Sequence, residues 1–472
     1  MKSIFKGNTF NMLSWINIWM KKSSKKILIQ CFNTLLFSIS VLSFGQTNNI
    51  SQTLIGSWEG AFIKNNSYQK LEIDFYEKDG ELFGLQIMDE WHPTFGEFNV
   101  PVTVDSTGII KFGTGYGMAN LNLDKNNLEI FGQLEGFNPS IYVHLKKIAR
   151  KPAPDYKVEE ISVSNSDITL AGHLHIPKAF EHKTAIILVG GRGCYADNTK
   201  YNLYAKFLRA YGVTVLAYQK RGNGDSTGDC SRATIGELAG DVVQMKDYLM
   251  KHPNGYKNVG VLGISAGGWT MVRAGEQTDF DFMISIVGPS TSVRDQQFQS
   301  AKYGAEIYKL SDSAKNNLKE YTRLMFEAES TPEGFENMMA ILNRSVEEGW
   351  REILDDTDIP ESIEAIEDLW VRRHDFDPKT ALSNYKKPFL GIYGDRDWIV
   401  PYKENIQSLN SYFSERPDLL NTVVAYNAEH GMETESKAVD LGDNQSYWHF
   451  YRISPHVRIE IIKFLTKYNF ID

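Results

Sequence analysis

The sequence is short of three features, and each shortage excludes a class of protein. Only three cysteines occur in 472 residues, too few for a framework of disulfides. An excess of positive charge is also lacking, because 50 lysines and arginines stand against 59 aspartates and glutamates. The resulting net charge of -9 does not favour nucleic acid as a partner. Long apolar runs are also rare, and only Ile27–Phe44 stands out. These features predict a mildly acidic globular chain of two or three domains.

The apolar run Ile27–Phe44 has the setting of an export signal. Lysines precede it, and small and polar residues follow it. A secretory signal peptide has the same order: a basic segment, an apolar segment and then small residues. We therefore expect residues 1–45 to direct export to the periplasm or the exterior and then to be removed. The alternative is an uncleaved anchor, which would be the chain's only contact with a membrane, but Gln30 and Asn33 interrupt the run.

Short alternating runs recur over residues 50–150, as in Leu71–Phe75 and Ile141–Leu145. Turn-forming residues separate these runs, and helical periodicity is nearly absent. This pattern predicts a small antiparallel β barrel or sandwich, with Trp58 and Trp91 in its core. No catalytic group of residues occurs here, so we expect a role in packing or substrate access.

After Lys151–Pro154, the best candidate for a domain boundary, the pattern changes. Apolar runs of the buried-strand type, Ala185–Val189 and Val213–Tyr218, alternate with helical patterns over Tyr201–Tyr211 and Ile235–Met250. This alternation predicts an α/β domain with a doubly wound, mainly parallel sheet.

A hairpin is expected at the start of this domain, from Val158–Val163 and Ile168–Ile176. His173 and His175 share one face of its second strand. Metal ligation is compatible with that spacing, but no acidic or cysteine partner lies nearby. We therefore interpret the two histidines as part of a solvated strand face, and we expect no metal site.

The pattern Gly-x-Ser-x-Gly occurs twice, at Gly224–Gly228 and at Gly263–Gly267. The first copy follows a loop. The second directly follows the apolar run Val259–Ile264 and precedes a helical pattern, which is the setting of a nucleophile elbow. Ser265 is therefore the candidate nucleophile, and Ser226 is not.

Five motifs follow one another between residues 155 and 472: Gly190–Gly193, Lys220–Ser226, Gly263–Trp269, Gly394–Pro401 and Glu429–Gly431. In these motifs and in their order, this part of the chain resembles the α/β-hydrolase superfamily, and within it the bacterial esterase and serine-aminopeptidase-like group. Two positions depart from the common pattern, with Gly190 in place of a histidine and Gln219 in place of an aspartate. Neither is a catalytic position, and both bear on the shape of the first loop.

A serine needs a base to take its proton, and the base needs an acid to orient it. In this fold the chain order is serine, acid, histidine. Asp397 and His430 each follow an apolar strand pattern downstream of Ser265, so we expect these three residues to form the catalytic triad. Asp395 is the competing acid, but the family pattern Gly-x-x-Asp favours Asp397.

An oxyanion hole requires two backbone donors. The amide of Ala266, which follows the nucleophile, is one. The resemblance implies Arg192 as the other, with Gly191 or Gly193 as alternatives. We interpret the Arg192 side chain as an exposed loop arginine rather than a substrate contact.

About a hundred residues separate the next apolar strand pattern from the one before Asp397, and about 295–380 is predicted to form a helical cap. Helices are expected over Ser313–Glu329, Pro332–Glu347 and Pro360–Arg372. Its larger apolar residues either line an acyl pocket or pack between helices, and we favour packing for each: Met325, Phe326, Met338, Met339, Trp350 and Trp370.

The expected activity is hydrolysis of small-molecule carboxylic esters through an acyl-enzyme, with no metal or organic cofactor. Peptide or thioester cleavage is the alternative, since one triad serves all three bonds. A non-catalytic binding protein on the same fold is the rival from another class, and the intact triad argues against it. Cys194 and Cys230 follow neighbouring expected strands, and two readings remain open for them: a disulfide or two buried thiols.

Overall fold

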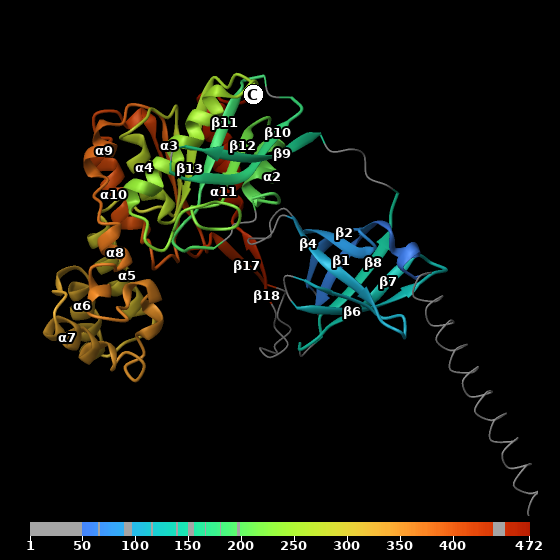
Figure 1. Ribbon diagram of the computed structural model, residues 1–472, viewed down its shortest axis with the longest axis horizontal. Helices are drawn as coiled ribbons and strands as arrows, with labels where there is room; N and C mark the ends of the chain where they lie inside the picture. The colour runs from blue at the N-terminus through green and yellow to red at the C-terminus, as the bar shows by residue number, and fades with distance from the viewer. Residues whose placement is uncertain are drawn as a thin grey trace, which may run out of the picture. The chain divides into compact units, whose positions relative to one another are not determined.

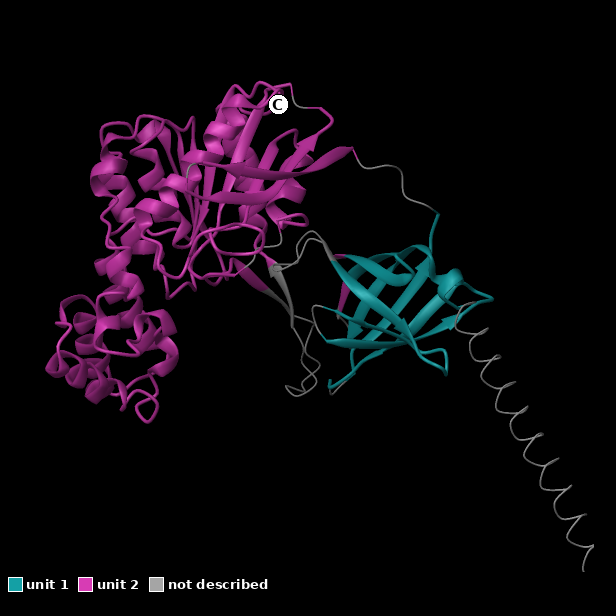
Figure 2. Cartoon of the chain, viewed as in Figure 1, with its two compact units in different colours: residues 1–64, 70–86, 99–150 teal, residues 65–69, 87–98, 151–472 magenta. Residues whose placement is uncertain are grey.

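The computed structural model describes residues 50–64, 67–88, 97–114, 117–137, 140–149, 155–165, 167–179, 181–195, 199–437 and 449–472 (Figure 1). The expected export signal, Trp91 and the expected boundary segment lie outside these residues. The chain divides into two compact units: residues 1–64, 70–86 and 99–150, and residues 65–69, 87–98 and 151–472 (Figure 2). No helix in the described part of the chain is long and apolar enough to cross a bilayer.

The first unit is a closed barrel whose strands pair in chain order. They are β1 (Gly56–Lys64), β2 (Ser67–Lys78), β3 (Glu81–Met88), β4 (Glu97–Val104), β5 (Ile110–Gly113), β6 (Met118–Asp124), β7 (Glu129–Leu134) and β8 (Tyr142–Lys147). The antiparallel pairing of β1 with β8 closes the barrel and leaves no open edge. Because side chains alternate along a strand, every second residue points inward. In the barrel core the buried Phe75 ring contacts both Trp58 and Phe112. The predicted all-β unit is confirmed.

The second unit is built on an eight-stranded sheet in the order β16-β15-β14-β13-β11-β12-β10-β9. Its strands are β9 (Tyr156–Ser164), β10 (Thr169–Pro177), β11 (Thr184–Val189), β12 (Thr214–Tyr218), β13 (Asn258–Ile264), β14 (Met283–Ile286), β15 (Phe389–Gly394) and β16 (Leu420–Ala425). The pairs from β12 to β16 are parallel, whereas β10 pairs antiparallel with β9 and β12. The chain leaves β11 to one side for β12 and to the other for β13. Such a change of direction is where α/β sheets place their sites.

Helices cover both faces of this sheet. One face packs against α3 (Ile235–Lys251), α4 (Gly267–Gly275), α9 (Lys379–Asn384) and α10 (Tyr402–Tyr412), and the other against α2 (Leu203–Arg209) and α11 (Pro455–Lys467). The central strand serves both cores, since Ile187 and Ile186 on β11 belong to opposite layers. The predicted doubly wound, mainly parallel fold is confirmed.

Between β14 and β15 the chain forms a separate helical layer, the cap (Figure 1). It contains α5 (Val293–Ile307), α6 (Asp312–Glu327), α7 (Pro332–Leu342), the short 3-10 turns η1 (Arg351–Ile353), η2 (Asp356–Asp358) and η3 (Glu364–Ile366), and α8 (Trp370–Arg373). Tyr321 and Trp350 are fully buried in its core.

The prediction of a third cap helix over Pro360–Arg372 is wrong. The chain there forms only η3 and the four-residue α8. Tertiary contacts hold this irregular path: the Asp358 carboxylate accepts from the Val371 amide at 3.1 Å, and the Arg372 guanidinium donates to carbonyls at the end of α6. The Val371 amide thus donates to a side chain of η2 and not to a preceding carbonyl, and Arg372 ties the segment to α6.

Candidate active site

Ser265 sits on the sharp turn between β13 and α4. Its φ is 52°, a left-handed value that is rare for residues with a side chain and typical of strained functional turns. Glycines make the turn possible, because a Cβ on Gly263 would lie 2.5 Å from the Gly267 carbonyl oxygen, and one on Gly267 would lie 2.4 Å from the Val189 oxygen. The Ser265 amide donates to the Ile286 carbonyl at 3.0 Å, which fixes the turn to β14.

The structure brings Ser265, His430 and Asp397 together. Ser265 Oγ lies 2.8 Å from His430 Nε2, and His430 Nδ1 lies 2.9 Å from Asp397 Oδ2. The other Asp397 oxygen accepts from the amides of Ile399 and Val400, both at 2.9 Å. With Nδ1–H donating to Asp397, Nε2 is left to accept the serine proton. A serine held in this way can attack a carbonyl carbon.

Asp397 and His430 reach this point from different strands. Asp397 lies in the loop after β15, and its side chain is fully buried. His430 follows β16 and is about one quarter exposed. Asp395, the competing acid, is exposed and makes no contact with His430 among the described residues.

The two expected oxyanion donors border the nucleophile. The Ala266 amide lies at the first turn of α4, and the loop after β11 places Gly191 and Arg192 in the wall of the same pocket as Ser265. A Cβ on Gly191 would lie 3.1 Å from Ser265 Cβ, so the loop approaches the serine closely. Within the described residues, neither the Ala266 nor the Arg192 amide donates to a protein acceptor.

The interpretation of Arg192 as an exposed loop arginine is wrong. Its side chain is 17% exposed and ion-paired with Asp358 at 2.6 Å and Asp355 at 3.3 Å. The guanidinium also lies 4.1 Å from the centre of the Trp370 ring. Burial raises the pKa of the Asp358 carboxyl, against the opposing effect of Arg192. Arg192 therefore joins the loop after β11 to the cap.

Sequence reasoning missed the role of Lys220 beside this loop. Lys220 is 8% exposed, and its ammonium group donates to the carbonyl oxygens of Gly191 and Gly193. The signal was its place in the second of the five motifs. One residue beyond Gly193, Cys194 forms a disulfide with Cys230, which decides between the two readings of these cysteines.

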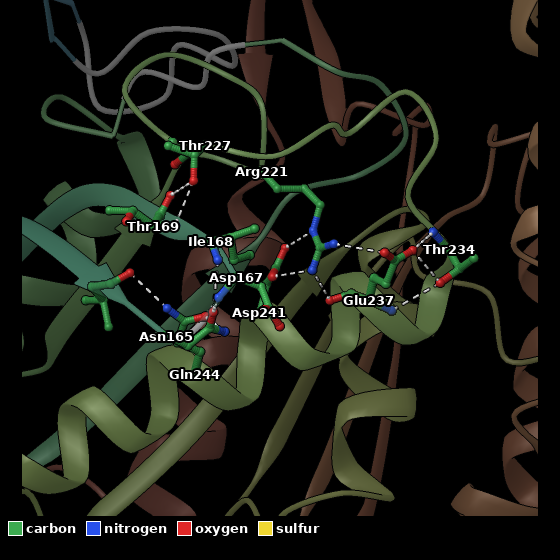
Figure 3. Close-up of polar contacts among 12 residues, drawn as sticks. Asn165, Asp167, Ile168, Thr169, Arg221, Thr227, Thr234, Glu237, Asp241 and Gln244 are labelled. Carbon is green, nitrogen blue, oxygen red and sulfur yellow. Dashed lines mark hydrogen bonds and ion pairs between the residues drawn. The ribbon is translucent and has the colours of Figure 1, made fainter.

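The second Gly-x-Ser-x-Gly copy has a structural role. Ser226 Oγ donates to the Gln219 carbonyl at 2.7 Å and accepts from the Ala171 amide at 2.9 Å, which ties the loop to β10. Nearby, the Arg221 guanidinium binds the buried Asp241 on α3, as Figure 3 shows. Ser226 is thus part of a braced loop and not a second nucleophile.

The prediction that His173 and His175 lie on a solvated strand face is also wrong. His175 is fully buried, with Nε2 at 2.7 Å from the Thr199 carbonyl and Nδ1 at 2.9 Å from Arg209. His173 Nδ1 lies 2.8 Å from Thr199 Oγ1. Helix α2 and the residues before it cover this face. The alternation of side chains along the strand shows which residues share a face, but it does not show what covers that face. Burial lowers the pKa of His175 to about 4.

A pocket of about 490 Å³ opens in front of Ser265 and His430. Its apolar lining comes largely from the cap: Ala301, Leu318, Met325, Ile353 and Leu354. Of the six cap residues considered for an acyl pocket, only Met325 lines it, whereas Met338 and Trp350 are buried in the cap core. Three carboxylates and one guanidinium give the lining a formal charge of -2: Glu352, Asp355, Asp358 and Arg192.

Residues 181–334 match the family model described as serine aminopeptidase, S33. Among solved structures, the chain is similar to an esterase of Pyrococcus furiosus, with 15% sequence identity and a TM-score of 0.41; the match covers 66% of this chain and 91% of the esterase. It is similar to a Butyrivibrio proteoclasticus protein with ferulic acid bound, with 16% identity and a TM-score of 0.38, over 65% of this chain and 98% of that protein. It is also similar to a Mycobacterium smegmatis proline iminopeptidase, with 16% identity and a TM-score of 0.42, over 66% of this chain and 98% of that protein. No curated protein matches the chain.

Proposed function

We propose that this α/β-hydrolase is an exported serine esterase that cleaves small-molecule carboxylic esters through Ser265, His430 and Asp397. The observation that carries the proposal is the chain of short contacts from Ser265 Oγ through the imidazole to the buried carboxylate, 2.8 and 2.9 Å long, on a strained elbow. Nucleophile, base and orienting acid are the three parts that acyl transfer to serine requires.

In this mechanism Ser265 Oγ attacks the ester carbonyl carbon while His430 Nε2 takes the hydroxyl proton. The negative oxygen that forms accepts from the amides of Ala266 and Arg192. Collapse of the tetrahedral intermediate breaks the bond to the alcohol oxygen, which receives the proton from His430. Water, activated by the same imidazole, then releases the acid from Ser265.

The pocket lining supports an uncharged ester as the substrate class. A volume of about 490 Å³ admits a small organic ester, and the apolar cap residues suit an uncharged acyl group. The formal charge of -2 disfavours an anionic acyl group, because like charges would meet in a partly enclosed space. We therefore expect neutral esters to be better substrates than esters of dicarboxylic acids.

The test is labelling with a serine-directed fluorophosphonate. The wild type is expected to be labelled at Ser265, and Ser265→Ala to lose both labelling and ester hydrolysis. Ser226→Ala is the matched control, because it removes the serine of the other Gly-x-Ser-x-Gly copy, and it should keep the label. Undiminished labelling of Ser265→Ala would refute the proposal.

A serine aminopeptidase is the second candidate, and the acidic pocket wall favours it. The exposed carboxylates of Glu352 and Asp355 border the same cavity as Ser265 and suit a substrate with a free amino group. Kinetics on p-nitrophenyl esters and aminoacyl anilides separate the two activities. If the peptidase reading holds, Glu352→Gln should raise KM for anilides while leaving KM for neutral esters unchanged.

Export is part of the proposal. The basic and apolar leader pattern supports it, as does the disulfide between Cys194 and Cys230, since disulfides persist mainly in oxidising compartments. N-terminal sequencing of the mature protein from its native host tests it: a first residue near 46 is expected, and a retained Ile27–Phe44 segment would contradict cleavage.

A further inference from the structure

We propose that Lys220 is a positioning residue of the oxyanion hole, which acts by holding the peptide unit whose N–H stabilises the negative oxygen. This inference rests on the proposed serine hydrolase function. It adds a requirement outside the triad, because Lys220 lies in the loop after β12 and belongs neither to the triad nor to the lining of the substrate pocket.

The contacts of Lys220 single out two peptide units. Its ammonium group donates to the carbonyl of Gly191 and, at 3.0 Å, to the carbonyl of Gly193. The Gly191 carbonyl belongs to the peptide unit between Gly191 and Arg192, and the Gly193 carbonyl belongs to the peptide unit between Gly193 and Cys194. A buried ammonium with carbonyl acceptors forms charge-assisted hydrogen bonds, which are stronger than neutral ones. Lys220 is 8% exposed, so water competes little for these bonds.

Because a peptide unit is planar, the hydrogen bond from Lys220 to the Gly191 carbonyl also sets the direction of the Arg192 N–H. The Gly191 carbonyl and the Arg192 amide are one peptide unit, and in a trans peptide the C=O and N–H point in opposite directions. When Lys220 holds the oxygen, the Arg192 N–H must point away from Lys220. The proposed oxyanion donor is therefore aimed by a residue that never touches the substrate.

Two cavities border this loop, and Gly191 and Arg192 line both. Of the two, Ser265 lines the substrate pocket, whereas Lys220 and Ala266 line a smaller cavity of about 160 Å³. The proposal directs the Arg192 N–H away from Lys220 and towards the substrate pocket.

The loop needs such a support because of its composition. Three of its four residues are glycines, Gly190, Gly191 and Gly193, and Gly193 adopts a φ of 108°. Glycine peptide units rotate with little steric hindrance, so the loop does not fix its own amides. Lys220 restrains the peptide units of Gly191 and Gly193, and its positive charge also polarises the Gly191–Arg192 unit, which strengthens the Arg192 N–H as a donor.

A purely structural role for Lys220 predicts something different. In that case its removal would lower stability, and the active fraction would keep its turnover number. Lys246 provides the matched control, since its ammonium group also donates to a backbone carbonyl, that of Asp279, and to Thr278 Oγ1 at 2.9 Å. It lies on α3 and does not line the substrate pocket.

The experiment compares Lys220→Met with Lys246→Met on a neutral short-chain ester, with the active sites titrated by fluorophosphonate. We expect Lys220→Met to lower kcat about 10- to 100-fold, with KM changed less than threefold. This loss is smaller than the roughly 100- to 1000-fold loss seen when an oxyanion donor is removed outright, because the Arg192 amide itself remains. The affinity of Lys220→Met for a boronic acid that mimics the tetrahedral intermediate should fall by a similar factor. Lys246→Met should change neither quantity, and Lys220→Arg should recover part of kcat.

A kcat for Lys220→Met within twofold of the wild type would overturn the inference, as would an equal loss in Lys246→Met. If Lys220→Met does not fold, Lys220→Gln, which keeps a donor for one carbonyl, should show the same split between kcat and KM. Ser265→Ala separates the two proposals: an active Ser265→Ala refutes the serine hydrolase itself. An inactive Ser265→Ala beside a fully active Lys220→Met refutes only the role of Lys220.

Discussion

Arg192 and Asp358, 166 residues apart in the chain, meet through a 2.6 Å ion pair that joins the proposed oxyanion loop to the cap. The Asp358 carboxylate is almost completely buried and also accepts from the Val371 amide at 3.1 Å. The Tyr321 hydroxyl donates to the Asp358 carbonyl at 3.1 Å. One aspartate thus connects the loop after β11 with η2, α6 and α8, so the cap and the oxyanion loop are expected to share their stability.

The first prediction concerns this ion pair. Asp358→Ala should lower the free energy of unfolding by about 3–5 kcal/mol, because it leaves the Arg192 guanidinium largely buried without its main partner. The double variant Arg192→Met/Asp358→Ala should lose less than the sum of the two single variants. Urea unfolding of all four proteins measures the coupling.

The exposed pair of Arg323 and Glu320 on α6 is the control for the first prediction. Glu320→Ala should change the free energy of unfolding by less than about 1 kcal/mol, since exposed ion pairs contribute little. Strict additivity in the Arg192 and Asp358 cycle would show that the contact does not couple the loop to the cap.

The second prediction concerns the disulfide. Cys194 and Cys230 are 36 residues apart in sequence, and their bond closes the segment that contains β12 and Lys220. Replacing both cysteines with alanine should lower the free energy of unfolding by about 2–4 kcal/mol, because the unfolded chain gains conformational freedom. Reductant should lower the thermal midpoint of the wild type and leave that of the double variant unchanged. A reductant effect on the double variant would contradict this account.

The third prediction is a pH dependence of stability from two buried histidines. Burial lowers the pKa of His175 to about 4 and that of His374 to about 4, against about 6.5 in an unfolded chain. Between these values the unfolded state binds more protons, so stability is present above pH 6.5 and is lost as the pH falls towards 4. Each histidine should contribute up to about 3 kcal/mol to this loss.

His374→Phe tests the third prediction. His374 stacks on Trp370 with ring centres 4.3 Å apart, and phenylalanine keeps a ring there that cannot be protonated. The free energy of unfolding, measured in urea from pH 7 to pH 4.5, should fall less steeply in this variant than in the wild type. Equal slopes would mean that His374 does not titrate on unfolding in this range.

The sequence predicts the position of the candidate site residues where local patterns determine the place of a residue in the fold. Ser265, Asp397 and His430 each follow an apolar strand, and parallel strands bring their carboxyl ends to one edge of the sheet, so the meeting of the three side chains was predictable. Whether these side chains catalyse a reaction remains a prediction.

The errors have the opposite cause, since each depended on partners distant in sequence. The sequence predicts an exposed Arg192 because its partner Asp358 is 166 residues away, and the covered face at His175 depends on Thr199 and Arg209. The apolar spacing over Pro360–Arg372 fits a helix, but it fits short turns held by other segments equally well. Periodicity reports which side of an element is apolar, and it does not report what covers that side.

The fourth prediction concerns the elbow glycines. Gly267→Ala should abolish activity or folding, because the new Cβ would lie 2.4 Å from the Val189 carbonyl oxygen, an atom fixed within the sheet. Gly191→Ala is a milder change: its Cβ would lie 3.1 Å from Ser265 Cβ and 3.6 Å from Ser265 Oγ. We expect Gly191→Ala to fold and to lose activity, because the methyl group crowds the nucleophile.

Gly240→Ala is the matched control for these glycine variants, because the position that its Cβ would take on α3 is open: in the described part of the chain, no heavy atom other than its chain neighbours and its own helix backbone lies within 4 Å. Alanine favours a helix interior over glycine, so this variant should gain roughly 0.5–1 kcal/mol in the free energy of unfolding at unchanged activity. Thermal unfolding and ester hydrolysis of the three variants, measured side by side, separate crowding at Ser265 from a general cost of added methyl groups. If Gly191→Ala were as active as Gly240→Ala, the close approach of the loop to Ser265 would have no part in the reaction.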